Sequence, residues 1–491
     1  MPTDRTKLKV LFGSWLALGV GNALAHGRLT YLTRLAQPGW YVALGAVSTV
    51  VLLGGWWATR EVPDAEWQSA FRPLLAVVAA AYLLNIWIQV TWTRDGGMLF
   101  GTGLDIDTSL YFCYGRQLLG WPPTAAPPCD DPSFGAGRYP TMEYPQGALG
   151  LFAGSVLLAG DSAATFRWFF ALVLVGFTLG SVALLLALGR ARGASRAAAF
   201  LTAAVLLSPY LFRLAPVRYD IVPTFFLLLG VYTFAGARGI LPRDSPVRNL
   251  PFAAMSGAAV AVAALLKWLP GLMLPFVVGC YMRRRAWGAA AAAVVAAGVL
   301  LAVTLVPFYL WDAAKFWHPY LAQTGRSLVG ESVWFLVQYT LLDPNPAVPG
   351  APWGRPPVIL VSNSLITPVQ AGLTLLPMAL AIIWAQTRAQ WAALGLCSVA
   401  IFILTNRVFS PQFVIALSFM WAAALILVRP GPRALVLALL ALLVVGLNNF
   451  LVFPLWPPGW VRASALLFAA AGLLTAGIVR LAIQQEFRNE V

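Results

Sequence analysis

The residues that could support chemistry stand in polar segments between long apolar runs. The first segment contains two carboxylates, Asp105 and Asp107, at the start of a stretch with helical character. An acidic residue at this place either caps the helix or acts as a general base that takes a proton from an acceptor hydroxyl. Since side chains two residues apart point in different directions in most conformations, we expect a single base and not a pair.

Several cations in other polar turns could bind a phosphate, because Arg and Lys stabilise the negative charge that a phosphate leaving group gains. Lys267 stands between two apolar runs, where a lysine either snorkels to the interface or holds an anion. Arg218 could simply pair with Asp220. A lone histidine in an aromatic stretch, His318, is either structural or a ligand. The candidate phosphate-binding residues are Lys267, Arg218, Arg213, Arg407 and His318.

The composition defines the class of protein that must position these residues. The chain has 491 residues, of which 60% are hydrophobic and 10% charged, and its mean hydropathy is +0.76. Soluble domains have about 25% charged residues, so a soluble enzyme, a disordered chain and a coiled coil are excluded. We expect an all-α polytopic integral membrane protein.

Apolar runs that cross, or nearly cross, about 30 Å of hydrocarbon recur through the chain and predict about 14 transmembrane helices. Two long polar segments, 93–145 and 311–363, interrupt them. The predicted spans are 10–25, 41–57, 73–92, 168–189, 197–213, 221–236, 252–266, 268–280, 287–310, 364–387, 390–405, 411–428, 434–451 and 463–483.

The orientation follows from the arginine and lysine clusters, which favour the cytoplasm. The net charge is +15, from 33 basic and 18 acidic residues. All clusters lie on the cytoplasmic side if 146–160 does not cross the membrane and if 252–280 is a hairpin broken near Pro270. The alternative, in which 146–160 crosses and 252–280 is one helix, moves two clusters outside. The clusters are Arg5/Lys7/Lys9, Arg190/Arg192/Arg196, Arg238/Arg243/Arg248, Arg283/Arg284/Arg285, Arg388, Arg429/Arg433 and Arg480.

Three motifs in this order resemble the C-type (GT-C) glycosyltransferases, and are most similar to family 87, the actinobacterial polyprenyl-phosphate-mannose-dependent mannosyltransferases. The first is Asp107-x-x-x-Tyr111, followed by Leu118-Leu119-Gly120 and Glu143-Tyr144-Pro145. The second is Gly257 to Arg285, with Lys267, Pro270 and Pro275, and the third is Ser410-Pro411-Gln412-Phe413. The family's Tyr-Pro-Pro is Tyr144-Pro145-Gln146 here, and its aspartate is doubled by Asp105.

The resemblance implies an inverting membrane enzyme that moves a sugar, mannose first among the candidates, from a polyprenyl-phosphate donor to a glycolipid or polysaccharide acceptor. The implied base is Asp107, with Asp105 as the fallback. The implied setting is the outer side of a bacterial plasma membrane. Rival functions are a flippase or transporter of lipid-linked glycans and an oligosaccharide ligase or polymerase. The substrate-binding candidates are Tyr111, Glu143, Tyr144, Asp220, Gln412 and Trp317.

The chain divides into four predicted parts. These are N-terminal membrane helices (1–72), a GT-C-like module (73–310) with a first outer loop at 93–160, a second outer loop (311–363) and C-terminal membrane helices (364–491).

Cofactor chemistry has little support in the sequence. Two histidines and no CxxC pair argue against zinc, and no Walker or GxGxxG motif indicates nucleotide binding. We expect no required cofactor, although Asp107, Asp220 and Glu143 could supply oxygen ligands to a divalent metal. Cys113 and Cys129 are either reduced or joined in a disulfide, which would close a loop of about 15 residues and contribute about 3 kcal/mol.

The orientation can be tested by labelling single cysteines from outside intact cells. In a variant without the four native cysteines, we expect Gly193→Cys and Ser245→Cys to stay unlabelled, because both lie beside arginine clusters. Ser327→Cys, in the second polar segment, is the positive control. Labelling at both 193 and 245 would contradict the preferred arrangement.

Overall fold

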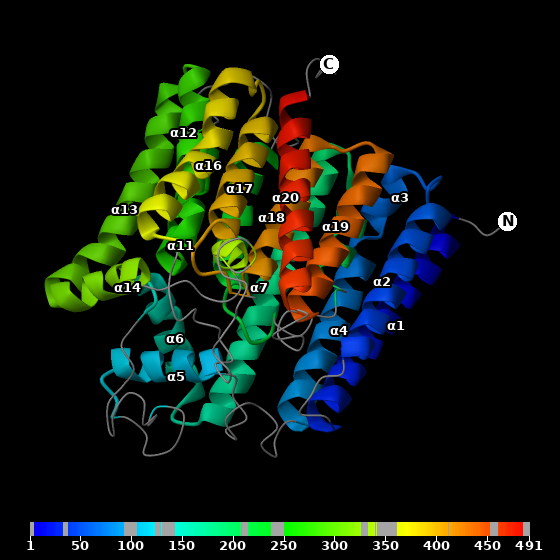
Figure 1. Cartoon of the computed structure of the whole chain (residues 1–491), viewed down its shortest axis with the longest axis horizontal. Coiled ribbons are helices and arrows are strands. Elements are labelled where there is room, and N and C mark those ends of the chain that lie inside the picture. Colours follow the sequence, from blue (N-terminus) through cyan, green and yellow to red (C-terminus); the bar gives the residue numbers. More distant parts are fainter. Residues whose placement is uncertain are drawn as a thin grey trace.

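The structure is a computed structural model of the chain. It describes residues 4–32, 38–92, 106–122, 129, 143–206, 208, 215–236, 250–325, 332–338, 340, 361–410, 412–451 and 460–484. Within these residues every regular element is helical (Figure 1).

The helices follow one another along the chain as follows. They are α1 (Asp4–Leu32), α2 (Pro38–Ala58), α3 (Asp64–Ser69), α4 (Phe71–Trp92), α5 (Ile106–Leu118), α6 (Gln146–Ala159), α7 (Ala163–Arg192), α8 (Ser195–Leu206), α10 (Ile221–Val231), a π-helical turn (Tyr232–Gly236), α11 (Leu250–Leu266), a 3-10 turn (Leu269–Met273), α12 (Leu274–Arg283), α13 (Trp287–Trp311), α14 (Ala313–Gly325), α15 (Val333–Val337), α16 (Asn363–Trp384), α17 (Arg388–Leu404), α18 (Phe413–Val428), α19 (Pro432–Leu451) and α20 (Trp460–Gln484).

Each predicted span overlaps a helix, although most of 197–213 beyond Leu206 lies outside the described residues, and the helices confirm an all-α integral membrane protein. Five helices in the described part of the chain, α4, α7, α13, α16 and α20, are long and apolar enough to cross a membrane by length and composition. Nine further apolar helices are shorter. The total of 14 crossings therefore stays a prediction.

A hairpin occupies the region where the sequence allowed either one helix or two. α11 ends just before Lys267, and Pro270 lies in the 3-10 turn that leads into α12. Gly288 lies against Leu250, so α13 starts at the same end of the bundle as α11 and runs parallel to it. α12 must therefore return the chain to that end, which agrees with the preferred arrangement.

Small residues allow α11 and α13 to pack backbone to backbone. The only buried residues of α13 are Ala289, Ala290, Ala293 and Ala297. A Cβ atom at Gly257 of α11 would collide with the backbone of Ala293. Close helix contacts of this kind stabilise membrane bundles, in which lipid removes the hydrophobic drive for association. The contact holds α11, and so the chain just before Lys267, in place.

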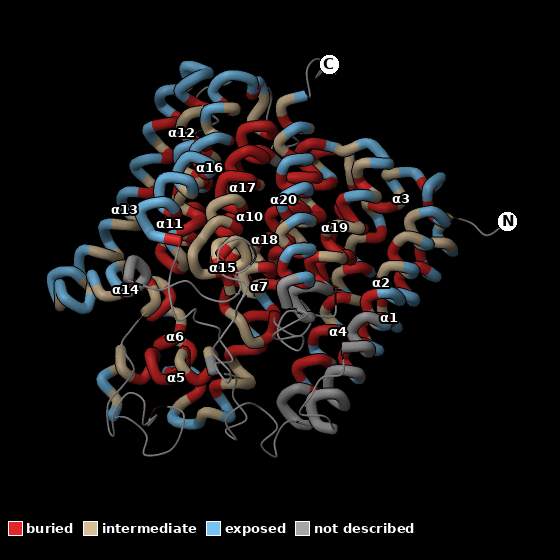
Figure 2. The backbone as a smooth tube through the Cα atoms, in the orientation of Figure 1, coloured by how far each residue is buried: buried red, intermediate tan, exposed pale blue. Residues whose placement is uncertain are grey.

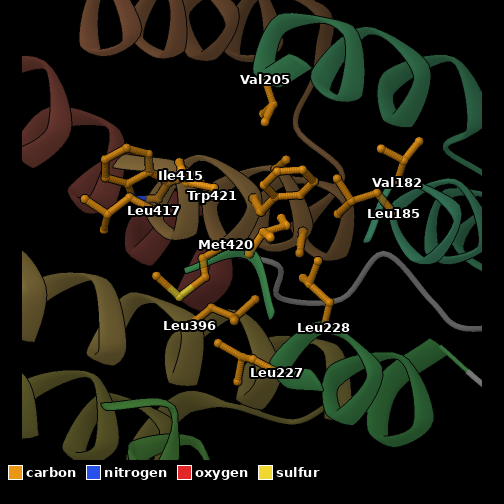
Figure 3. Close-up of a cluster of buried hydrophobic side chains, with 14 of the residues drawn as sticks. Val182, Leu185, Val205, Leu227, Leu228, Leu396, Ile415, Leu417, Met420 and Trp421 are labelled. Atoms are coloured by element: carbon orange, nitrogen blue, oxygen red, sulfur yellow. The ribbon is translucent and has the colours of Figure 1, made fainter. Parts of the chain in front are cut away.

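The centre of the bundle is formed by α17 and α18, which are buried along almost their whole length (Figure 2). The indole Nε1 of Trp421 donates a hydrogen bond to Thr475 Oγ1 in α20 at 3.0 Å. By contrast, only 22% of the apolar stretch of α13, and of α16, is buried. Figure 3 shows side chains of α7, α8, α10, α17 and α18 meeting in the core, among them Val182, Leu185, Val205, Leu227, Leu228, Leu396 and Met420.

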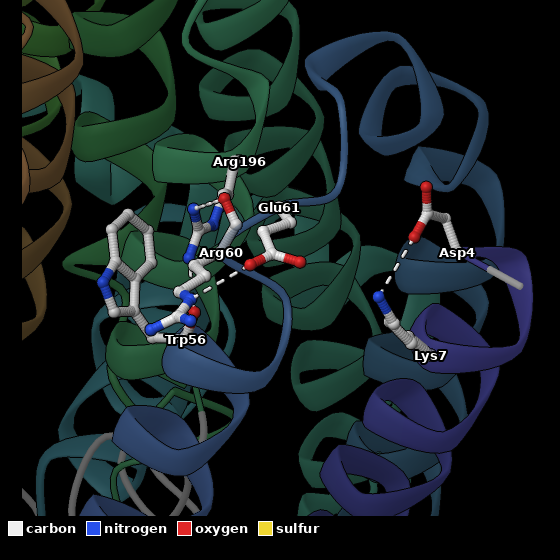
Figure 4. Close-up of polar contacts among 6 residues, drawn as sticks. All are labelled: Asp4, Lys7, Trp56, Arg60, Glu61 and Arg196. Atoms are coloured by element: carbon white, nitrogen blue, oxygen red, sulfur yellow. Dashed lines mark hydrogen bonds and ion pairs between the residues drawn. The ribbon is translucent and has the colours of Figure 1, made fainter. Parts of the chain in front are cut away.

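One end of the bundle, which we call the arginine end, gathers the described basic clusters. Arg196 at the start of α8 lies 3.7 Å from the Trp56 ring and donates to the Arg60 carbonyl at 2.9 Å (Figure 4). Its backbone N–H donates to Asp64 Oδ1 at 3.1 Å. These contacts tie α8 to the loop between α2 and α3. The cluster at 238–248 lies outside the described residues.

Other cations close the same end across the bundle. Arg283 donates to the Ala381 carbonyl at 3.1 Å, Arg284 donates to the Gln386 carbonyl at 2.7 Å, and both carbonyls lie at or just beyond the end of α16. Arg429 lies beside Gly193. The described basic clusters thus share one end of the bundle, which is the pattern that the positive-inside rule predicts.

The opposite end, which we call the site end, carries α5 and α6 (Figure 1). α6 has 14 residues and is therefore about 21 Å long, which is too short to cross about 30 Å of hydrocarbon. Its first residue, Gln146, donates to the Phe316 carbonyl and accepts from the Tyr320 hydroxyl, both in α14. α7 begins at the same end, which agrees with the preferred arrangement, in which 146–160 does not cross.

We expect Gly257→Leu to destabilise the protein by about 1–3 kcal/mol or more, because an added side chain overpacks the α11–α13 contact. Thermal unfolding in detergent measures the loss. Gly298→Leu, at an exposed position of α13 with open space around it, should unfold like the parent protein. Equal stability of both variants would contradict the close packing.

Candidate functional site

α5 is held rigidly at the site end. Cys113 and Cys129 are joined in a disulfide, with their Cα atoms 5.4 Å apart. The buried Arg116 forms an ion pair with Asp161 in the turn before α7 and donates to the Pro122 carbonyl at 2.7 Å. These links fix the direction of α5, whose first turn presents Asp107.

The turn before α10 faces α5 and carries two charges in three residues. Arg218 forms an ion pair with Asp107, and Asp220 forms one with Lys267. The two charges of the turn thus reach different places, Arg218 to α5 and Asp220 to the chain just after α11. Thr108 Oγ1 donates to the Val217 carbonyl at 3.2 Å, which ties the turn to α5.

The side chain of Lys267 packs against the protein. Its side chain is 18% exposed, and that of its partner Asp220 is 1% exposed. The ammonium lies 4.1 Å from the centroid of the Phe413 ring and 5.7 Å from that of Tyr219. The break after α11 frees the chain to place this cation where α11, α10 and α18 meet. Aromatic faces favour a cation at such distances.

Three tyrosines pack together behind the charges. The rings of Tyr111 and Tyr144 lie 5.5 and 5.4 Å from that of Tyr219, and Phe152 of α6 stacks on Tyr111 at 4.5 Å. The Tyr219 hydroxyl donates to the Leu266 carbonyl at 3.3 Å, directly before Lys267. These contacts fix the position of Tyr219, and so of the turn that carries Arg218 and Asp220.

These tyrosines stay neutral over the physiological pH range. Burial raises the pKa of each phenol well above its usual range. The neighbouring Tyr144 adds to the effect at Tyr111, Asp107 adds to it at Tyr144, and Asp220 adds to it at Tyr219. The cluster therefore supplies hydroxyl groups and not phenolates.

A cavity adjoins the inner ion pair. It is small, about 20 Å³, and lies between Lys267, Asp220 and apolar side chains of α10, α17 and α18. Asp220 Oδ2 is buried beside this cavity and has no hydrogen-bond partner among the described residues. Buried polar atoms are normally satisfied, so this oxygen indicates a place for a water molecule or a donor group of a ligand. The apolar lining residues include Leu227, Val399, Ile403, Ala416 and Met420.

The structure brings together Asp107, Arg218, Asp220, Lys267 and the tyrosines Tyr111 and Tyr144. Other predicted residues lie around this group. Gln412 precedes Phe413, whose ring lies against Lys267, and Arg407 is half-buried in the turn after α17. Glu143 is half-buried beside Tyr144. Asp105 and Arg213 lie outside the described residues.

The remaining candidates lie on α14. Trp317 is 51% exposed and packs on Phe316 and Tyr320. His318 is half-buried on the same helix. α14 reaches the site end through Gln146.

Sequence reasoning missed three residues that organise the site. Gln146 bonds α6 to α14, Tyr219 anchors the turn, and Phe413 faces Lys267. Only Gln146 had a clear signal, because it replaces the second proline of the family's Tyr-Pro-Pro. In the described part of the chain, no group of three or more His, Cys, Asp or Glu side chains could hold a metal ion.

No family model matches the sequence, and no curated protein does. The solved structure of ArnT from Cupriavidus metallidurans bound to undecaprenyl phosphate is similar with a TM-score of 0.42 and 17% sequence identity. The match covers 82% of this chain and 76% of that chain. A similarity of this size carries no argument about the function of this protein.

Proposed function

We propose that the protein is a membrane glycosyltransferase that takes a sugar from a polyprenyl-phosphate donor and attaches it to a glycolipid or polysaccharide acceptor. The donor is lipid-linked, the site faces outside the cell, and mannose is the first candidate sugar. One observation carries the proposal: a carboxylate and two cations, Asp107, Arg218 and Lys267, converge at the end of the bundle opposite the arginine end.

In the proposed inverting reaction, Asp107 removes the proton of the acceptor hydroxyl as its oxygen attacks the anomeric carbon. The bond between that carbon and the phosphate oxygen breaks, and its electron pair stays on the phosphate. The lipid phosphate therefore gains negative charge in the transition state. Arg218 and Lys267 are the cations placed to stabilise it, and their effect is greatest in a water-poor site.

The surroundings of Lys267 support a lipid-borne anion as the ligand. The cation lies at the rim of an apolar cavity and is held by Asp220. A charged lysine is costly near hydrocarbon unless it has a partner or a function. In a phosphate attached to an apolar chain, the phosphate complements the Lys267 ammonium and the chain complements the apolar side chains of the cavity.

A flippase or a lipid-diphosphate-dependent ligase are the rival functions. The described candidate charges gather at the site end, whereas transporters place substrate sites near mid-membrane. A carboxylate in the first turn of α5, paired with a cation, supports transfer chemistry with a base. Incubation of purified protein with polyprenyl-phosphate sugars and candidate acceptors, followed by mass analysis, separates the functions: a flippase yields no new glycoside.

Asp107→Asn should abolish sugar transfer, by about 100-fold or more, because removal of a general base costs this much. Transfer is measured with radiolabelled donor in nanodiscs. The variant should unfold near the parent temperature and still bind polyprenyl phosphate. Asp312→Asn is the matched control, since this exposed carboxylate lies at the end of α13 and pairs with Lys315. Full turnover by Asp107→Asn would reject Asp107 as the base.

Lys267→Met should raise the donor KM or lower kcat by about tenfold, because the phosphate loses a charge-assisted hydrogen bond. The single variant also leaves Asp220 buried and unpaired, which can cost about 3–5 kcal/mol of stability.

The double variant Lys267→Met/Asp220→Asn removes both charges and separates the two effects. It should fold better than the single variant and still lose donor affinity. Lys315→Met is the control for an exposed cation. An unchanged donor profile in the folded double variant would assign Lys267 a structural role only.

A further inference from the structure

The two ion pairs at the site leave the candidate base neutralised. Asp107 is bound to Arg218, and Lys267 is bound to Asp220, so each cation already has an anion. A carboxylate held by a guanidinium is a weaker proton acceptor than one without it. The arrangement in the structure therefore holds a base that is not yet active.

The two pairs differ in how easily they can open. Asp220 is 1% exposed, so loss of Lys267 would strand a buried charge. Asp107 and Arg218 are 20% and 13% exposed, so water can reach both when they separate. Lys267 also has three donor hydrogens and can bind a phosphate without leaving Asp220. Opening the Asp107–Arg218 pair therefore costs less free energy than opening the Asp220–Lys267 pair.

The backbone around Arg218 is fixed, so the exchange requires only a side-chain movement. Tyr219 is buried among Tyr111, Tyr144 and Phe152, and its hydroxyl is bonded to the Leu266 carbonyl. The neighbouring Val217 carbonyl accepts from Thr108. The turn cannot shift as a unit without breaking these contacts.

We infer that Arg218 passes from Asp107 to the lipid phosphate and thereby activates the base. The inference rests on the proposed function. As the bond between the sugar and the phosphate breaks, the phosphate changes from one negative charge toward two and becomes a stronger partner than the carboxylate. Arg218 follows that charge, and Asp107 is released when it must accept the proton of the acceptor. Lys267 stays on Asp220 as the fixed cation.

The exchange makes Asp107 a competitor of the phosphate, and this is measurable without turnover. Binding of radiolabelled polyprenyl phosphate is measured in nanodiscs for the parent protein, Asp107→Asn, Arg218→Gln and the double variant. Removal of the competitor should tighten binding by about fivefold, the effect expected for an ion pair worth about 1 kcal/mol. In the Arg218→Gln background the Asp107→Asn change should have no effect.

Three controls separate the exchange from general effects. Uncharged polyprenol should bind the parent and Asp107→Asn equally, and Asp312→Asn should bind polyprenyl phosphate like the parent. Asp107→Ala replaces Asp107→Asn if the amide variant does not fold. A purely structural role of the Asp107–Arg218 pair would weaken binding in every variant, which is opposite to the expected tightening.

Each other outcome has a definite meaning. Unchanged or weaker binding by Asp107→Asn, or the same tightening without Arg218, overturns the exchange and leaves the proposed function intact. If the parent protein binds polyprenyl phosphate no better than polyprenol, the proposed function itself fails, and the exchange fails with it.

Discussion

A charge in a water-poor environment needs an opposite charge, and the site end is built around this requirement. Arg218 and Asp220 are separated by one residue, yet each is paired with a different helix, Asp107 on α5 and Lys267 after α11. The two pairs tie the turn before α10 to both neighbours at once. Because Asp220 is almost fully buried, its pair is the fixed point, and the more exposed pair is free to respond to a ligand.

The helix break after Leu266 makes this arrangement achievable. Lys267 still donates its backbone N–H to the Ala263 carbonyl, and Pro270 then keeps the helix from continuing, because a proline has no N–H group to donate. The packing of Gly257 on Ala293 fixes α11, the helix that ends at the break. The position of one cation thus depends on a proline, a glycine and a row of alanines that take no part in chemistry.

The two ends of the bundle use charge differently. At the arginine end, Arg196, Arg283 and Arg284 donate hydrogen bonds to backbone carbonyls, and Arg196 also lies over a tryptophan ring. These contacts join helices that are distant in sequence. At the site end, cations face carboxylates beside a cavity. A rigid frame with a few adjustable side chains is the expected design for a site that must hold reacting groups within fractions of an ångström.

The sequence by itself determined the helical membrane class, the places of the apolar helices, the common face of the basic clusters and the residue types of the site, because hydropathy and charge are local properties. It left open whether 252–280 was one helix or two, and it offered Arg218 and Asp220 as partners of each other. Only the tertiary structure decided the pairing with Asp107 and Lys267 and revealed the parts of Gln146, Tyr219 and Phe413. Contacts between side chains far apart in the chain depend on how helices pack, and no spacing along the sequence encodes them.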